Sequence, residues 1–130
     1  MKKIKPQKVK EEVVAKKLTK IVFGFSKLQP LSYPNSTEVN FFINYLGRLK
    51  KLCELEWDVI WATHKHGFGT ETIPISSLKQ SAQNLVPPKI TKLLVLRATG
   101  DNRSFLGYRD DNVFQVIFIE ANFGDIYPHG

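Results

Sequence analysis

Apolar residues recur along the chain with two different periods. Residues 19–28 place Ile21, Phe23 and Phe25 at every second position, which predicts a first strand. From Val39 onward the period becomes helical. One face of an amphipathic helix of about 18 residues would then carry Val39, Phe42, Ile43, Leu46, Leu49 and Cys53. Asn35, with Glu38 three residues later, has the spacing of a capping box at the start of this helix.

A second, shorter helix and three further strands follow. Trp57, Ile60, Trp61 and His64 have helical spacing, and glycines at 67 and 69 end the helix. Residues 70–90 read as a polar connection with one helical turn around residues 78–83. Strands are predicted at 91–99, 103–109 and 113–120, with Asp110–Asn112 as a tight turn between the last two. The last strand is apolar on both faces except at Gln115, which is typical of a central strand.

This order is β-α-α-β-β-β, an α+β class in which a helical hairpin packs on a sheet of antiparallel strands. We expect residues 19–130 to form a single α+β domain. Residues 1–18 are a basic N-terminal arm, in which residues 11–18 have the charge order of a short helix.

The charge of the chain is concentrated in that arm. The first twenty residues hold eight of the nineteen basic residues and only two acidic ones, whereas the whole chain carries +7. Such a patch attracts a polyanion, nucleic acid first and an anionic membrane surface second, although a solvated basic tail without a specific partner is the plain alternative. The predicted nucleic-acid contacts are Lys2, Lys3, Lys5, Lys8, Lys10, Lys16, Lys17, Lys20 and Arg109.

Cysteine content and hydropathy bear on the compartment. Cys53 is alone, so no internal disulfide can form, and this favours a reducing compartment. No apolar run reaches the length that spans a bilayer, and no apolar stretch or cleavage site of a secretory signal follows the basic start. We therefore expect a cytoplasmic protein that has no membrane partner.

The sequence lacks the motifs of metal sites, of reactive cysteines and of cofactor-binding sites. His64-Lys65-His66 has no cysteine pair or carboxylate at ligand spacing, so we expect no metal. Cys53, on the predicted apolar helix face, reads as a buried, inert thiol. No Ser-His-Asp spacing, phosphate-binding glycine loop or dinucleotide fingerprint is present, and no cofactor is expected.

The C-terminal half offers a candidate for chemistry. Arg97 ends one strand, Arg103 opens the next, and Tyr127 and His129 lie near the end of the chain. Guanidinium groups beside a tyrosine and a histidine can cleave RNA without a metal. One group removes the 2′-hydroxyl proton, cations stabilise the phosphate and an acid protonates the leaving oxygen. The alternative is that these arginines are strand-edge residues kept in water by their charge.

The segment KLLVLRATGDNRSFLGYRDDNVFQVIFIEANFGDIY resembles the C-terminal half of the RelE/ParE superfamily of toxin-antitoxin toxins. The matching features are Leu96-Arg97, Arg103, the turn at 110–112, the apolar strand at 113–119 and Tyr127. The resemblance implies a curled antiparallel sheet and a toxin neutralised by a protein antitoxin. The toxin would be either an endoribonuclease that cuts mRNA on the ribosome or a gyrase poison.

Site residues follow from the same resemblance. Arg97 and Arg103 would contact the scissile phosphate, Tyr127 would stack on a base or transfer a proton, and His129 would act as the acid. The chain departs from the family after its last strand, where residues 120–123 lack the usual basic residue. Of the lysines that many members place between helices and sheet, only Lys65, Lys79 and Lys89 are candidates.

Two other readings stay open. One is a non-catalytic module of the same fold that binds nucleic acid or protein. The other is an interaction protein, for instance from a mobile element, with Phe68, Tyr108 and Phe123 as its partner surface. The ribonuclease hypothesis requires Arg97, Arg103 and Tyr127 to meet in one hollow.

Overall fold

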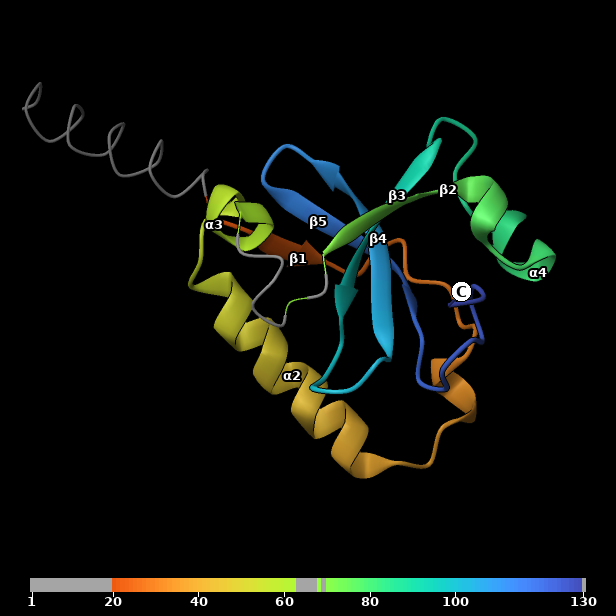
Figure 1. Ribbon diagram of the computed structural model, residues 1–130, viewed down its shortest axis with the longest axis horizontal. Coiled ribbons are helices and arrows are strands. Elements are labelled where there is room, and N and C mark those ends of the chain that lie inside the picture. Colours follow the sequence, from red (N-terminus) through yellow and green to blue (C-terminus); the bar gives the residue numbers. More distant parts are fainter. Residues whose placement is uncertain (1–19, 63–67, 69, 130) are drawn as a thin grey trace, which may run out of the picture.

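A computed structural model describes residues 20–62, 68 and 70–129. The chain forms an α+β fold around one five-stranded sheet whose strand order is β1-β5-β4-β3-β2 (Figure 1). The strands are β1 (Val22–Gly24), β2 (Glu71–Pro74), β3 (Lys92–Arg97), β4 (Ser104–Asp110) and β5 (Val113–Ile119). The α-helices in the described residues are α2 (Val39–Cys53), α3 (Trp57–Ala62) and α4 (Gln80–Gln83), with 3₁₀ turns η1 (Tyr33–Asn35) and η3 (Ile75–Ser77).

The sheet is mixed, which corrects the expectation of a purely antiparallel one. β1 pairs in parallel with β5, whereas β5, β4, β3 and β2 are joined antiparallel. The parallel pair arises because α2 and α3, together with the later strands, carry the chain back to the same end of the sheet. β5 is indeed a central strand, as its apolar sequence predicts.

The first strand is much shorter than residues 19–28. After β1 the chain still follows β5, since the Gln29 amide donates to the Ile117 carbonyl (2.8 Å) and Ser32 forms a parallel bridge with Ile119. Pro30 lies between them and has no N–H to give. The regular ladder stops at Gly24 because the chain turns directly after it, where the Leu28 amide donates to the Phe25 carbonyl (3.1 Å).

The stretch 70–90, predicted as a polar connection, contains the edge strand β2. In this strand only Ile73 is buried, so four residues are too few to display an alternating pattern. The helical turn predicted around residues 78–83 is present as α4.

The face that α2 presents to the sheet agrees with the predicted one at Leu49 and partly at Phe42, but otherwise differs from it. Its buried residues are Phe41, Tyr45, Leu49 and Leu52, whereas Val39, Ile43 and Leu46 are exposed. Two apolar stripes run along this helix, and the aromatic one packs inward, where the Tyr45 ring meets Phe105 edge-on at 5.0 Å between centroids. The start is also different: Glu38 is the N-cap position, its amide donates to Ser36 Oγ (3.2 Å), and Asn35 belongs to η1.

The three C-terminal strands lie where the sequence predicts them. The β4–β5 turn contains Asp111 at φ 58°, a left-handed conformation that Asp tolerates. The ladder shifts register beside Gly107, which faces Val116, and a Cβ at Gly107 would overlap the Gln115 carbonyl oxygen. Only glycine fits the backbone at this point.

Both faces of the sheet are covered. α2 and α3 pack on one face, where Phe41, Tyr45, Trp57 and Ile60 meet the apolar side chains of β3, β4 and β5. The opposite face holds a second core in which Leu78 and Ala82 of the η3–α4 region meet Ile126 and Tyr127 of the C-terminal segment. Figure 1 shows that segment beside α4, and the Lys79 amide donates to the Ile126 carbonyl (2.9 Å). Over the residues described, no helix is both long enough and apolar enough to cross a bilayer.

Candidate functional site

A hollow of about 390 Å³ lies where β2, β3 and β4 meet the C-terminal segment. Arg97 reaches it from the end of β3 and Ser104 from the start of β4, and Glu71 opens β2. The C-terminal segment supplies Phe123, Tyr127 and His129. Three of the four residues predicted as catalytic, Arg97, Tyr127 and His129, are therefore brought together.

Arg97 is the cation of this hollow. Side chains alternate along a strand, so Arg97 shares the face of Val95, which packs in the same core as Tyr127. Within residues 20–62, 68 and 70–129, no carboxylate forms an ion pair with its guanidinium. An unpaired guanidinium at the wall of a hollow is suited to an anionic ligand.

His129 is held by a buried acid. Its Nε2 lies 2.7 Å from Oε1 of Glu120, whose side chain is fully buried directly after β5. The other carboxylate oxygen of Glu120 accepts the Ile126 amide (3.1 Å). Burial raises the pKa of Glu120, although the Ile126 amide and His129 act in the opposite direction. The pair fixes the ring and leaves Nδ1 as the nitrogen that can exchange a proton with a ligand.

Sequence reasoning missed Glu120 and counted it only as a departure from the family pattern. The sequence offered little signal for it, because acids are mostly exposed and are fully buried only when they have a partner. The partner nine residues later was not predictable from spacing, because it depends on how the C-terminal segment folds back.

Tyr127 does not have the role that the resemblance implies. Its ring is 5% exposed and lies against the His129 ring, with 3.9 Å between centroids, so it has no free face for a base. Its hydroxyl donates to Glu71 Oε1 (3.1 Å). Burial is the main cause that raises the pKa of Tyr127, and Glu71 adds to it. The phenol is therefore a fixed proton-bearing group that orients Glu71.

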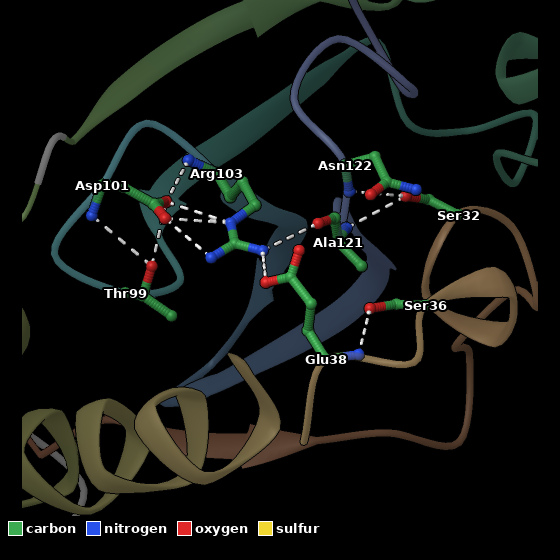
Figure 2. Close-up of polar contacts among 8 residues, drawn as sticks. All are labelled: Ser32, Ser36, Glu38, Thr99, Asp101, Arg103, Ala121 and Asn122. Atoms are coloured by element: carbon green, nitrogen blue, oxygen red, sulfur yellow. Dashed lines mark hydrogen bonds and ion pairs between the residues drawn. The ribbon is translucent and has the colours of Figure 1, made fainter. Parts of the chain in front are cut away.

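Arg103 lies outside the hollow, on the other face of the sheet, which corrects the expectation that it meets Arg97 and Tyr127. Figure 2 shows its guanidinium between Asp101 and Glu38, with ion pairs of 2.7 Å to each carboxylate. It also stacks over the Phe41 ring at 4.4 Å and donates to the Ala121 carbonyl (3.1 Å). The hydrogen bonds from Arg103 lower the pKa of Asp101 to about 2. Arg103 has a structural role, because two carboxylates neutralise its charge and its side chain is only 18% exposed.

The loop that leads into the C-terminal segment is fixed from both sides. Ser32 Oγ accepts the Ala121 amide (2.9 Å), while Arg103 donates to the Ala121 carbonyl (Figure 2). The Ser32 hydroxyl also donates to Asp125 Oδ2 (2.8 Å). Ser32 has φ 76° and ψ −67°, and the Tyr33 amide bonds to the Leu31 carbonyl across it (3.1 Å). This is a classic γ-turn, which is strained for a non-glycine residue. The strain is retained where the turn anchors the segment that carries His129.

Neither of the two predicted nucleic-acid contacts that the structure describes lines the hollow. Arg109 stacks over Trp57 at 4.3 Å at the far end of β4, and Lys20 is exposed beside β1. The other seven predicted lysines, like His64, Lys65 and His66, lie outside the described residues. Of the predicted partner aromatics, Phe123 alone is largely exposed, while Phe68 and Tyr108 are half-buried.

Cys53 is exposed, not buried as predicted, because the inward stripe of α2 is the aromatic one. Partial burial, together with the neighbouring Glu54, raises the pKa of the Cys53 thiol. A thiol in this setting stays protonated and is a poor nucleophile.

Within the described ranges, no group of three histidine, cysteine or acidic residues could hold a metal ion. The chain was also compared with protein-family models, with curated proteins and with solved structures, and no match was found in any of the three.

Proposed function

We propose that this chain is a RelE/ParE-like toxin, a cytoplasmic endoribonuclease that cuts mRNA without a metal, on the ribosome or free, and is neutralised by a protein antitoxin. Arg97, Arg103 and Tyr127 do not meet as the hypothesis drawn from the sequence required, so Arg103 and Tyr127 have no catalytic part in this proposal. The proposal depends instead on one other observation. An unpaired guanidinium (Arg97), a carboxylate (Glu71) and a histidine held by a buried acid (His129 with Glu120) line the same hollow. A base, an acid and a phosphate-binding cation are what RNA transesterification requires.

Each group has a defined part in the step. Glu71 takes the proton from a ribose 2′-hydroxyl, and the 2′-oxygen attacks the adjacent phosphorus. The bond from phosphorus to the 5′-oxygen breaks, and His129 gives that oxygen a proton through Nδ1. Arg97 stabilises the negative charge on the non-bridging oxygens. The products are a 2′,3′-cyclic phosphate and a 5′-hydroxyl, so no co-reactant is consumed.

Expression of the chain alone tests this proposal. We expect growth arrest and new mRNA ends that carry a 5′-hydroxyl, and purified protein should produce the same ends on translated mRNA or on free RNA. His129→Asn and Arg97→Gln should each slow cleavage by about 100-fold or more. Lys51→Gln removes an exposed charge from α2, on the other face of the sheet, and is the control. Arrest that persists unchanged in both site variants contradicts the assignment.

A non-catalytic binding module of the same fold is the second candidate. It is favoured by the position of Arg103, which leaves Arg97 as the single arginine that lines the described hollow. A module that binds through the basic arm should bind RNA in a salt-sensitive way, should lose binding when residues 1–17 are deleted, and should leave the RNA intact. Intact RNA in the cleavage assay, with salt-dependent binding, would decide for this candidate.

A further inference from the structure

Two further spaces adjoin the central hollow and extend it into a row. A hollow of about 260 Å³ shares Asn102 and Phe123 with it, and its other lining residues are the ion-paired Asp101 and Arg103. Another of about 430 Å³ shares Glu71, Tyr127 and His129 with it. A row of this kind, in which His129 lines two of the three spaces, suits an extended polymer better than a compact small molecule.

Phe123 forms the wall between the first two spaces. One face of its ring lies against His129, with 4.1 Å between centroids, yet the side chain is 53% exposed. It is the end of a stack that runs from Tyr127 through His129 to Phe123. Exposed aromatic rings of this kind are the platforms on which single-stranded nucleic acids stack their bases.

Asn102 is the polar group beside that ring. It is exposed and lines both spaces, and in the described part of the chain its side-chain amide has no hydrogen-bond partner. The neighbouring Asp101 is not available, because its two carboxylate oxygens already accept from Thr99 and from the backbone and guanidinium of Arg103. An asparagine amide pairs in bidentate fashion with the N6 and N7 of adenine.

We infer that Phe123 and Asn102 form a nucleobase subsite, which holds a base next to the bond that is cut and prefers adenine. The inference rests on the proposed function for its substrate, RNA, but its binding readout is independent of cleavage. It also moves the stacking role from Tyr127, which is covered, to Phe123, which is open.

Binding of uncleavable RNA tests the subsite directly. The probes are fluorescent 2′-O-methyl pentanucleotides that carry adenine, uracil or an abasic sugar at each position in turn, measured by anisotropy at fixed salt. For the wild type we expect one position at which loss of the base weakens binding about tenfold or more. Phe123→Leu should bind the adenine probe as weakly as the wild type binds the abasic one. Asn102→Ala should keep the effect of the base but lose the preference for adenine.

Phe25→Leu is the matched control, because Phe25 is also an exposed phenylalanine (41%) but lines a separate hollow beside β1. This variant should bind every probe with the affinity of the wild type. If Phe123→Leu discriminates against the abasic probe as strongly as the wild type does, or if the wild type binds all probes alike, the subsite is refuted. Base-dependent binding without any RNA cleavage would retain the subsite and refute the nuclease. RNA cleavage at the same rate by Phe123→Leu and the wild type would retain the nuclease and refute the subsite.

Discussion

At the scale of single residues, a buried polar group without a hydrogen-bond partner has a measurable effect on stability. The Tyr45 hydroxyl is buried between α2 and the sheet and has no hydrogen-bond partner in the described structure. Burial raises the pKa of Tyr45, so the group stays neutral but still loses its hydration.

Tyr45→Phe should therefore raise the free energy of unfolding by about 1 kcal/mol, because it removes an unsatisfied polar group and keeps the ring that meets Phe105. Urea denaturation followed by circular dichroism measures the change. If Tyr45→Phe instead lowers the free energy of unfolding by a similar amount, the Tyr45 hydroxyl forms a hydrogen bond in the folded protein, and the prediction is wrong.

Gly107→Ala should destabilise the fold by about 3 kcal/mol, since the added carbon would overlap the Gln115 carbonyl and lie 2.7 Å from the Phe114 ring. Gly47→Ala is its matched control. Gly47 lies inside α2 with open space around it, so this change should stabilise by about 0.5–1 kcal/mol. Equal effects of the two substitutions would exclude close packing as the cause.

At the scale of elements, the decisive feature is how the C-terminal segment is tied to the rest of the chain. Ser32, before η1, holds residues 121 and 125, and Arg103, before β4, holds residue 121 from the other side. Segments far apart in the sequence thus fix the loop that precedes Tyr127 and His129.

Substitutions at Ser32 separate strain from bonding. Ser32→Ala keeps the strained φ of 76° and loses the three hydrogen bonds of the hydroxyl, so it should lower the unfolding free energy by about 2 kcal/mol. Ser32→Gly loses the same bonds but accepts this φ without strain and should cost clearly less. Thermal melts of both proteins make the comparison, and a glycine variant less stable than the alanine variant would contradict it.

The elements were predictable to the extent that their pattern was regular. The three C-terminal strands were found because long β-branched and aromatic runs are interrupted by strong turn residues such as Asp111. The inward face of α2 was mistaken because Ile43 and Leu46 are as apolar as Tyr45, and only the partner surface decides between them. β2 was missed because four residues hold too little periodicity.

The same limit applies to the site. Arg97, Tyr127 and His129 were found from residue type and position near the end of the chain, and they do line one hollow. Arg103 was misplaced because its position at the start of a strand does not reveal Asp101 and Glu38, whose carboxylates hold its guanidinium away from Arg97. Glu71 was not predicted as a site residue because it lies in β2, the strand that was not predicted from the sequence.

At the scale of the whole molecule, two acids of the described residues have pKa values that folding shifts in opposite directions. Asp101 ionises more readily in the folded protein than in a free chain, and Glu120 less readily. They act in different pH windows, so their contributions to stability can be measured separately.

Asp101 contributes stability that is present above its ordinary pKa of 3.8 and is lost as the pH falls toward about 2. Asp101→Asn should be less stable than the wild type at pH 6, and the two proteins should converge near pH 2. The difference should be below about 1 kcal/mol, because the carboxylate is half exposed (51%) and screened by water. Urea titrations at several pH values provide the test, and curves that stay parallel down to pH 2 would exclude the Arg103 pair as the cause.

The stability that Glu120 contributes depends on pH in the opposite direction to that of Asp101. Its pKa is raised above 4.5, so its contribution is greatest below that pH and decreases as the pH rises through the higher folded value. Glu120→Gln should flatten the loss of stability between pH 4.5 and neutrality, as measured by denaturant midpoints. Because the amide also orients His129 less well, cleavage by this variant should fall and its pH profile should shift. Glu120 is thus a positioning residue, and an unchanged pH profile would remove that role.

The pairing of β1 with β5 has a consequence for biosynthesis. One partner of this pair leaves the ribosome early and the other late, so β1 must wait for nearly the whole described chain before it acquires its neighbour. The hollow depends on residues that emerge later still. A nascent chain therefore cannot form the site until residues 123–129 have also left the ribosome, and the activity that we propose cannot begin before then.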